Sequence, residues 1–371
     1  MKYLIFSAVL VSAFSGCRNE KESSNTSGTF DQRIDSLFAT APDFSGVALI
    51  AHDGKAKYHK AWGHKNFVTR EPLDTNSVFE LASLSKQFTA MTIMLLQEEG
   101  KLSYDDTVER YIPGIPYPRI TIRHLLNHTS GLPDYQAIMD QYWDKSRVAG
   151  NTENIAYLIK YHPARHFAPG EKYEYSNTGY MLLATIAERA SEKDFHMLSR
   201  EMIFKPLDMN STDIRSGEEK RNLPDMAWGH IYDQHKGSYI PADSFPDFNY
   251  TIWLGNRVGP GRISSTARDL LLWDRALRSG RLAQHRSLME AYSPARLNND
   301  SLSYYGFGWR IERHPVLGKV VRHSGDNPGY KTHIARYLDF GATLILLSNN
   351  QHEKFNQLVD GMQHLLAKTS E

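Results

Sequence analysis

A serine and a nearby lysine in this sequence have the residue types and the spacing needed for acyl transfer. Ser83 and Lys86 lie three positions apart in the segment Ser83-Leu84-Ser85-Lys86. On a helix this spacing puts both side chains on one face, so the amine can reach the hydroxyl. A serine hydroxyl needs an adjacent base, and a lysine can serve when burial or positive charge lowers its pKa. The segment predicts a serine nucleophile beside a lysine, although a capping serine and a surface lysine share this spacing.

A second element, Tyr175-Ser176-Asn177, follows the turn at Pro169 and Gly170 and precedes a predicted helix. A tyrosine beside a lysine ammonium is pushed toward phenolate, which can take the serine proton and pass it to a leaving group. The Asn177 amide can donate to a substrate carbonyl while its oxygen accepts from a lysine. The alternative is a partly buried aromatic residue followed by a helix cap.

A third element, His323-Ser324-Gly325, stands at the end of a predicted strand. A glycine at this position lets a substrate approach the strand edge closely. His323 is a candidate for polarising the Tyr175 oxygen or binding a substrate carboxylate. A lone histidine is also commonly structural.

The elements that must position these residues are read from hydrophobic periodicity and from turn signals. Helices are predicted at 30–41, 83–97, 122–126, 153–161, 178–192, 267–278 and 353–367. Strands are predicted at 46–50, 56–62, 306–311, 320–323, 331–338 and 342–347. Strands at both ends with helices between them predict an α+β fold, in which one antiparallel sheet is built from both termini and flanked by helices. A mainly helical subdomain is inserted into it.

The N-terminus has the pattern of a signal peptide. Lys2 precedes an apolar stretch that ends in small residues before Cys17, the only cysteine of the chain. We therefore expect a lipoprotein-type signal over residues 1–17, lipidation at Cys17 and a polar tether over 18–29. An ordinary cleaved signal with an incidental cysteine is the alternative. Residues 30–371 form the predicted catalytic domain, and the expected location is the bacterial cell envelope, as a periplasmic or surface lipoprotein.

Charge excludes one broad class of partner. Lys and Arg total 43 against 42 for Asp and Glu, so no positive excess is available to neutralise the phosphates of a nucleic acid. With 371 residues, 41% of them hydrophobic, the chain is long enough to bury a substantial core.

The order of the three elements resembles the serine β-lactamase and penicillin-binding-protein superfamily, in particular the class C β-lactamase-like branch, whose second element is Tyr-X-Asn. Further stretches look similar: ITIRHLLNHTSGL at 120–132, FAPGEKYEYSNTGY at 167–180 and GPGRISSTARDLLL at 259–272. The resemblance covers roughly residues 30 to 365.

The resemblance implies a β-lactamase/transpeptidase-like fold and a serine hydrolase that needs no cofactor or metal. It implies Ser83 as nucleophile, Lys86 and Tyr175 as its base system, and Asn177, His323, Ser324 and Gly325 as substrate-binding residues. The backbone N–H groups of Ser83 and Asp326 would form the oxyanion hole. His323 departs from the lysine usual in β-lactamases, and this shifts the expectation toward an esterase or a peptidase acting on D-amino-acid or other small amides. Esters, D-amino-acid amides, peptidoglycan fragments and β-lactams all stay open as substrates.

Two readings of other classes stay open. His124 and His128, and again His162 and His166, stand four positions apart, a spacing that suits a zinc hydrolase. Neither pair carries the glutamate of a His-Glu-X-X-His element. The second alternative is a non-catalytic, penicillin-binding-like envelope receptor lipoprotein that keeps the fold.

Overall fold

The structure is a computed structural model that describes residues 28–369. Cys17, the predicted signal over residues 1–17 and nearly all of the predicted tether lie outside the described residues. Gly28 and Thr29 are described, and the Thr29 side chain caps the first helix by accepting from the Gln32 N–H. Among the helices of residues 28–369, none combines the length and apolar composition needed to cross a bilayer.

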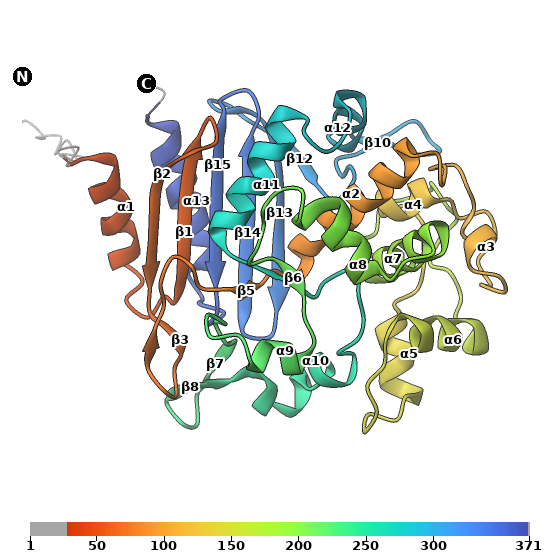
Figure 1. Ribbon diagram of the computed structural model, residues 1–371, viewed down its shortest axis with the longest axis horizontal. Coiled ribbons are helices and arrows are strands. Elements are labelled where there is room, and N and C mark those ends of the chain that lie inside the picture. The colour runs from red at the N-terminus through yellow and green to blue at the C-terminus, as the bar shows by residue number, and fades with distance from the viewer. Residues whose placement is uncertain (1–27, 370–371) are drawn as a thin grey trace, which may run out of the picture.

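A six-stranded antiparallel sheet is the centre of the fold, with the strand order β12-β13-β14-β15-β1-β2. Its strands are β1 (Gly46–His52), β2 (Lys55–Trp62), β12 (Arg310–His314), β13 (Gly318–Asn327), β14 (Tyr330–Tyr337) and β15 (Ala342–Ser348). The pairing of Gly46 with Ser348 joins the two ends of the chain. The predicted sheet from both termini is confirmed (Figure 1).

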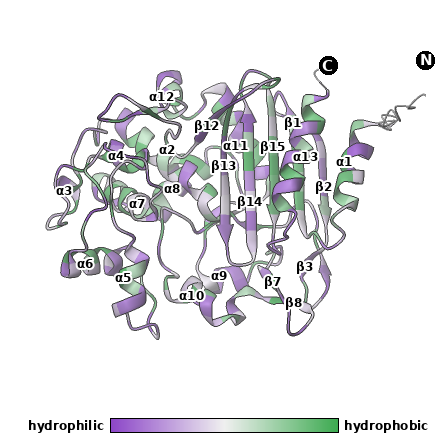
Figure 2. Cartoon of the chain, turned by 180° about the vertical axis from the view of Figure 1, so that it is seen from behind, coloured by the Kyte–Doolittle hydropathy of each residue, from purple (hydrophilic) through white to green (hydrophobic). Residues whose placement is uncertain are grey.

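Helices cover both faces of this sheet. Helices α1 (Phe30–Ala39) and α13 (Phe355–Ala367) share one core cluster with Ala48, Ile50, Leu344 and Leu346. The alternate residues Val47, Leu49, Ile345 and Leu347 face the larger core on the other side, beside α11 (Ala267–Ser279). Because successive strand residues point to opposite faces, a strand covered on both sides is apolar throughout. Figure 2 shows this hydrophobic colouring along β15.

The middle of the chain forms a mainly helical region beside the β12–β13 edge of the sheet, as predicted (Figure 1). Its helices are α2 (Ser85–Glu98), α3 (Val108–Tyr111), α4 (Ile122–Leu126), α5 (Tyr135–Tyr142), α6 (Asn151–Tyr161), α7 (Asn177–Ser191), α8 (Phe195–Ser199), α9 (Gly217–Arg221), α10 (Tyr250–Trp253) and α12 (His285–Ala291). A small sheet of β5 (Phe79–Glu80), β9 (Ile263–Ser265) and β6 (Asp213–Ile214) links the region to the large one. Three two-stranded pairs complete the strands: β3 (His64–Asn66) with β4 (Glu71–Pro72), β7 (His230–Asp233) with β8 (Ser238–Pro241), and β10 (Ala295–Arg296) with β11 (Leu302–Ser303).

The strand predicted at 306–311 is wrong in its bounds, because β12 begins only at Arg310. Phe307, Trp309 and Ile311 are all buried, and their alternation imitates a strand. Gly308 instead has φ +78°, and a Cβ there would lie 3.0 Å from the backbone of α2. The segment is a turn that lets two backbones pack closely.

Candidate active site

Ser83 lies in a 3-10 turn, Ala82–Leu84, that leads directly into α2. The turn is fixed at Leu81, whose N–H donates to the Ile263 carbonyl at 2.8 Å and whose carbonyl accepts from the Thr332 hydroxyl at 2.8 Å. Ala82 has φ +49°, a left-handed conformation that costs an L-residue roughly 1–2 kcal/mol. Such strain is held only where the surroundings over-determine it, and here it precedes the predicted nucleophile.

Gly325 of β13 makes room for this turn. A Cβ at Gly325 would lie 2.3 Å from the Leu81 carbonyl oxygen and 3.0 Å from the Ala82 Cβ. The sequence predicts that Gly325 lets a substrate approach the strand edge, but in the structure the space beside Gly325 is occupied by Leu81 and Ala82. Gly325 lets the turn that carries Ser83 pack against the strand.

Lys86 is completely buried in the first turn of α2 and contacts three oxygen atoms. Its Nζ lies 3.1 Å from Ser83 Oγ, 2.8 Å from Asn177 Oδ1 and 2.9 Å from the Pro260 carbonyl oxygen. Burial, and secondly the Arg257 guanidinium, hold the pKa of Lys86 well below its usual value. A neutral amine has two N–H donors and one lone pair. In the neutral form, which the lowered pKa favours, the two carbonyl-type oxygens take the N–H donors and the lone pair is left for the Ser83 hydroxyl.

Tyr175 lies over this lysine, with its ring centroid 4.7 Å from Lys86 Nζ. Its buried hydroxyl has no group in hydrogen-bonding geometry among the described residues, although the nearby Ser83 hydroxyl slightly favours its ionisation. Burial outweighs that effect and raises the pKa of Tyr175. The expected push toward phenolate is therefore not found in the free site, and Tyr175 carries its proton.

Asn177 is the first residue of α7, and the helix cap is its neighbour Ser176, whose hydroxyl accepts from the Gly179 N–H at 3.2 Å. The Asn177 oxygen accepts from Lys86, as the sequence predicts, which leaves the amide N–H groups for another acceptor. Asn177, Ser83 and Asp326 all line one cavity of about 80 Å³.

The β13 edge beside this cavity is free on one side. Strand β12 begins at Arg310, which pairs with Arg322, so residues 323–327 have no strand partner on the β12 side. The first N–H groups of a helix also lack intrahelical partners. Ser83 and Asp326 thus lie on two segments that border the same cavity, and their N–H groups remain the predicted oxyanion hole.

His323 is placed differently from the prediction. It lies inside β13, which continues to Asn327, and only 2% of it is exposed. Its Nδ1 is 2.7 Å from the Ser324 carbonyl oxygen and must donate to it, so Nε2 accepts from the Tyr305 hydroxyl at 2.8 Å. Burial, aided by Lys86, lowers the pKa of His323 to about 3. The imidazole is neutral and has no free nitrogen for a carboxylate or for Tyr175.

Ser324 lies on the opposite face of β13 from Gly325, since successive strand residues alternate. Its side chain is exposed and its hydroxyl is 2.9 Å from His333 Nδ1. The structure therefore brings Ser83, Lys86, Tyr175 and Asn177 together and leaves the Ser324 side chain outside the site.

The paired histidines serve the fold. Helix α4 ends at Leu126, and His128 follows it with φ +57°, so His124 and His128 do not share a helix face. His124 Nδ1 accepts from the Thr121 N–H, and His128 Nδ1 accepts from the Ser176 N–H, both at 3.1 Å. His162 ends α6, and His166 contacts Glu174. Among residues 28–369 no three His, Cys, Asp or Glu side chains are arranged to hold a metal ion.

Sequence reasoning missed several residues that complete the site. Tyr305 fixes the tautomer of His323, and the His128 ring packs 4.3 Å from the Tyr175 ring. Arg257, in a loop distant in sequence, acts on Lys86 through its charge. Tyr305, His128 and Arg257 all lie outside the three short elements in the sequence. Two of the similar stretches described above do reach the site: 120–132 contains His128, and 259–272 contains Pro260, which contacts Lys86.

Several known proteins are similar to this chain. A family model described as Beta-lactamase matches residues 34–368. Penicillin-binding protein 4* of Bacillus subtilis is 40% identical over 341 residues, which cover 90% of this chain and 76% of that protein. A D-aminopeptidase of Cereibacter sphaeroides is 26% identical over 86% of this chain, but the match spans only 60% of that enzyme. The structure of D-amino acid amidase from Ochrobactrum anthropi SV3 superposes with a TM-score of 0.73 at 25% identity, covering 93% of this chain and 100% of the other.

Proposed function

This chain belongs to the beta-lactamase family and is a serine hydrolase, and we propose that it cleaves small amides or esters of D-amino-acid type through an acyl-enzyme on Ser83. The observation that carries the proposal is the position of Lys86. Its buried Nζ, with two carbonyl-type oxygens already engaged, is 3.1 Å from Ser83 Oγ. A general base must lie within hydrogen-bond reach of the proton that it removes.

In the proposed acylation, Ser83 Oγ attacks the substrate carbonyl while Lys86 takes the hydroxyl proton. The N–H groups of Ser83 and Asp326 bind the oxyanion. Tyr175, which carries its proton, gives this proton to the leaving amine or alcohol as the bond between the carbonyl carbon and the leaving nitrogen or oxygen breaks. The Lys86 ammonium then returns a proton to the Tyr175 phenolate. Water attacks the acyl group in a second step and releases the acid.

The substrate class rests on two kinds of support. The neutral, fully engaged His323 offers no cation to a carboxylate near Tyr175, where a β-lactamase usually presents a lysine. The names of two similar proteins, a D-aminopeptidase and a D-amino acid amidase, indicate amides of D-amino acids. We therefore expect amide or ester hydrolysis to exceed β-lactam hydrolysis.

The test compares release of p-nitroaniline from D- and L-alanine p-nitroanilide by the unmodified protein, Ser83→Ala and Ser324→Ala. Ser324 is the matched control, because its side chain lies on the other face of β13. We expect hydrolysis of the D-isomer that disappears in Ser83→Ala and persists in Ser324→Ala. Equal hydrolysis by the Ser83→Ala protein would refute the proposal, and preference for the L-isomer would refute the substrate class.

We also propose, from the sequence alone, that Cys17 carries a lipid that anchors the chain to the bacterial envelope. The basic residue, the apolar stretch and the small residues before Cys17 support this. Metabolic labelling with an alkyne fatty acid should mark the native chain and leave Cys17→Ser unmarked. Equal labelling of both, or of neither, would contradict it.

A further inference from the structure

The cavity beside Ser83 has a wall that carries cationic side chains. Arg257 and Arg262 both line it, together with Glu80. Glu80 is ion-paired with the buried Lys220, at 2.5 Å between Oε1 and Nζ. Burial raises the pKa of this carboxyl group, but Lys220 and Arg262 outweigh burial and hold the pKa below its usual value. The Glu80 carboxylate is therefore acted on by three cations, Lys220, Arg262 and Arg257.

Both guanidinium groups keep donors that no described residue accepts. Arg257 donates through Nη1 to the Tyr135 hydroxyl at 2.5 Å, and Arg262 donates through Nη2 to the carbonyls of Thr251 and Leu254. Nε of each is buried without a partner. Arg262 also has φ +82°, a strained conformation for a side-chain-bearing residue. Buried donors are normally satisfied, and a site that keeps several of them open is suited to an acceptor from outside.

The Arg257 guanidinium group lies close to the turn that carries the nucleophile. A Cβ built on Gly261 would lie 3.6 Å from Arg257 Nη2 and 3.8 Å from the Ala82 carbonyl oxygen. The preceding residue, Pro260, contacts Lys86. Arg257 therefore reaches the segment that carries Ser83, across one glycine without a side chain.

The carboxylates nearby do not cancel this positive charge. Asp134 acts on Arg257 through space, and Asp326 lines the cavity. Both are exposed, and each already accepts a hydrogen bond, Asp134 from the Gln136 N–H and Asp326 from the Gln351 amide. Exposed charges are hydrated and screened, whereas those of Arg257, Arg262 and Lys220 are held in a protein environment.

The cavity lies on the acyl side of the bond to be cleaved. In the proposed function, on which this step rests, Tyr175 protonates the leaving group, so the leaving group departs toward Tyr175. Tyr175 and His323 are not among the residues that line the cavity, whereas Ser83 and Asn177 are. The part of the substrate that stays on Ser83 is thus the part that faces the arginines.

We propose that the acyl group of the substrate carries a carboxylate, which Arg257 and Arg262 bind in this cavity. Charge-assisted hydrogen bonds from guanidinium groups suit a planar carboxylate in geometry and in charge. The enzyme then selects acidic acyl groups, such as a D-amino acid with a carboxylate side chain, over neutral ones of the same length.

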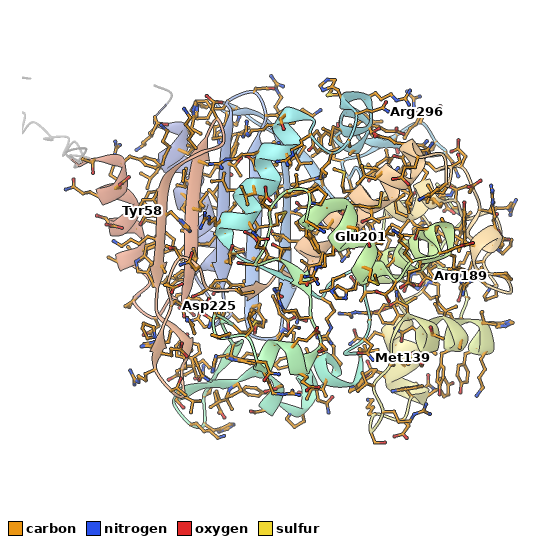
Figure 3. All side chains as sticks on the ribbon, viewed as in Figure 1. Tyr58, Met139, Arg189, Glu201, Asp225 and Arg296 are labelled. Carbon is orange, nitrogen blue, oxygen red and sulfur yellow. The ribbon has the colours of Figure 1, made fainter. Side chains whose placement is uncertain are left out.

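Two esters with the same leaving group test this preference. p-Nitrophenyl hemiglutarate has a free carboxylate on its acyl chain, and p-nitrophenyl methyl glutarate has it masked as a methyl ester. We expect kcat/KM of the purified protein to favour the free carboxylate by about tenfold or more, the factor typical of a charged hydrogen bond. Arg257→Gln and Arg262→Gln should each lower this ratio about tenfold. Arg296→Gln, an exposed arginine near α12 that is paired with Asp300 (Figure 3), should keep it.

Folding of each variant is checked by circular dichroism. If neither arginine variant folds, competition in the unmodified protein decides: glutarate should inhibit hydrolysis of the methyl ester more strongly than monomethyl glutarate. Equal inhibition by the two, no preference in the unmodified protein, or an unchanged ratio in both folded variants would overturn the inference. Ser83-dependent hydrolysis of the methyl ester without any preference would leave the proposed function intact. Absence of Ser83-dependent hydrolysis of both esters would overturn the two together.

Discussion

At the scale of single residues, the chemistry depends on how Lys86 loses its charge. A buried ammonium is unfavourable because burial penalises the charged form, and the neighbouring Arg257 adds repulsion. A lysine at the surface would stay protonated and could not accept from Ser83. Arginine could not replace it, because a guanidinium group keeps its charge and has no acceptor.

Tyr175 gives the sharpest residue-scale prediction. Tyr175→Phe should lower kcat by roughly a hundredfold or more, the usual contribution of a general acid. It should change KM little, because the ring contacts with His128 and Lys86 remain. Steady-state kinetics on an anilide, whose leaving group needs a proton, measure both quantities.

Tyr173→Phe is the matched control, since the Tyr173 hydroxyl is also buried without a partner and its ring packs against the same Tyr305. We expect its kcat to stay within a few-fold of the unmodified protein. Similar losses in both variants would mean that Tyr175 acts through packing and not through its proton.

At the scale of elements, β13 positions the nucleophile by packing against the turn that carries Ser83. The strand edge, the Ala82–Leu84 turn and β14 meet at Leu81, which the Thr332 hydroxyl holds. A displacement of about 1 Å can cost a hundredfold in rate. The strained backbone conformation of Ala82 persists because these contacts fix it.

Gly325→Ala should therefore disrupt the site from a distance. The new Cβ would meet the Leu81 carbonyl oxygen at 2.3 Å, so the turn must move. We expect kcat/KM to fall by about a hundredfold and the free energy of unfolding to fall by about 1–3 kcal/mol. Gly217→Ala is the control, because a Cβ there meets only the Arg221 side chain, at 3.5 Å. Normal activity in Gly325→Ala would show that the close approach does not hold Ser83.

The buried His323 makes stability depend on pH. Its pKa is about 3 in the folded protein and about 6.5 when unfolded. Between these values the unfolded state binds more protons, so the free energy of unfolding falls as the pH drops. The part of this loss that comes from His323 reaches about 3 kcal/mol near pH 4. Urea unfolding at about pH 7 and pH 4 should show a smaller loss for His323→Asn, and an unchanged loss would contradict this account.

Short-range patterns predicted most of these elements. The bounds of α4 agree with the prediction, and β1, β15 and α13 differ from it by two residues or fewer at each end, because each has clear periodicity and a turn signal. The strand predicted at 306–311 was misplaced because two glycines pack against other backbones, which no local pattern reveals. Ser324 was predicted to be a site residue because it lies between His323 and Gly325 in the sequence. Successive side chains of β13 point to opposite faces of the sheet, however, so the Ser324 side chain points away from the site.

At the scale of the whole molecule, the fold depends on contacts between the two ends of the chain. Helices α1 and α13 close one face of the sheet, and β1 lies between β2 and β15. On the other face, Asp274 of α11 accepts from Arg336 of β14 at 2.7 Å. The α+β arrangement was predictable from the order of elements. The buried Asp274–Arg336 pair and the effect of Arg257 on Lys86, however, join residues far apart in sequence. Sequence spacing alone could not place them.

Met362→Ala tests the stability of the covered face separately from the site. Met362 is completely buried in α13 and packs in the core cluster behind the sheet. We expect the free energy of unfolding to fall by about 2–5 kcal/mol, while kcat/KM at moderate temperature stays unchanged. The exposed His364 of the same helix supplies the control variant His364→Ala, with an effect within about 0.5 kcal/mol. A large loss of kcat/KM in folded Met362→Ala would contradict the separation of this core from the site.

The proposed mechanism requires the substrate's acyl group to be carried on the Ser83 hydroxyl. The most direct measurement is intact-protein and peptide mass spectrometry after rapid acid quenching of the protein with an activated p-nitrophenyl ester. The account predicts one acyl adduct, located on the peptide at Ser83, absent from Ser83→Ala and accumulated in variants with slow deacylation. An adduct on another residue, or undiminished ester hydrolysis by Ser83→Ala, would contradict it.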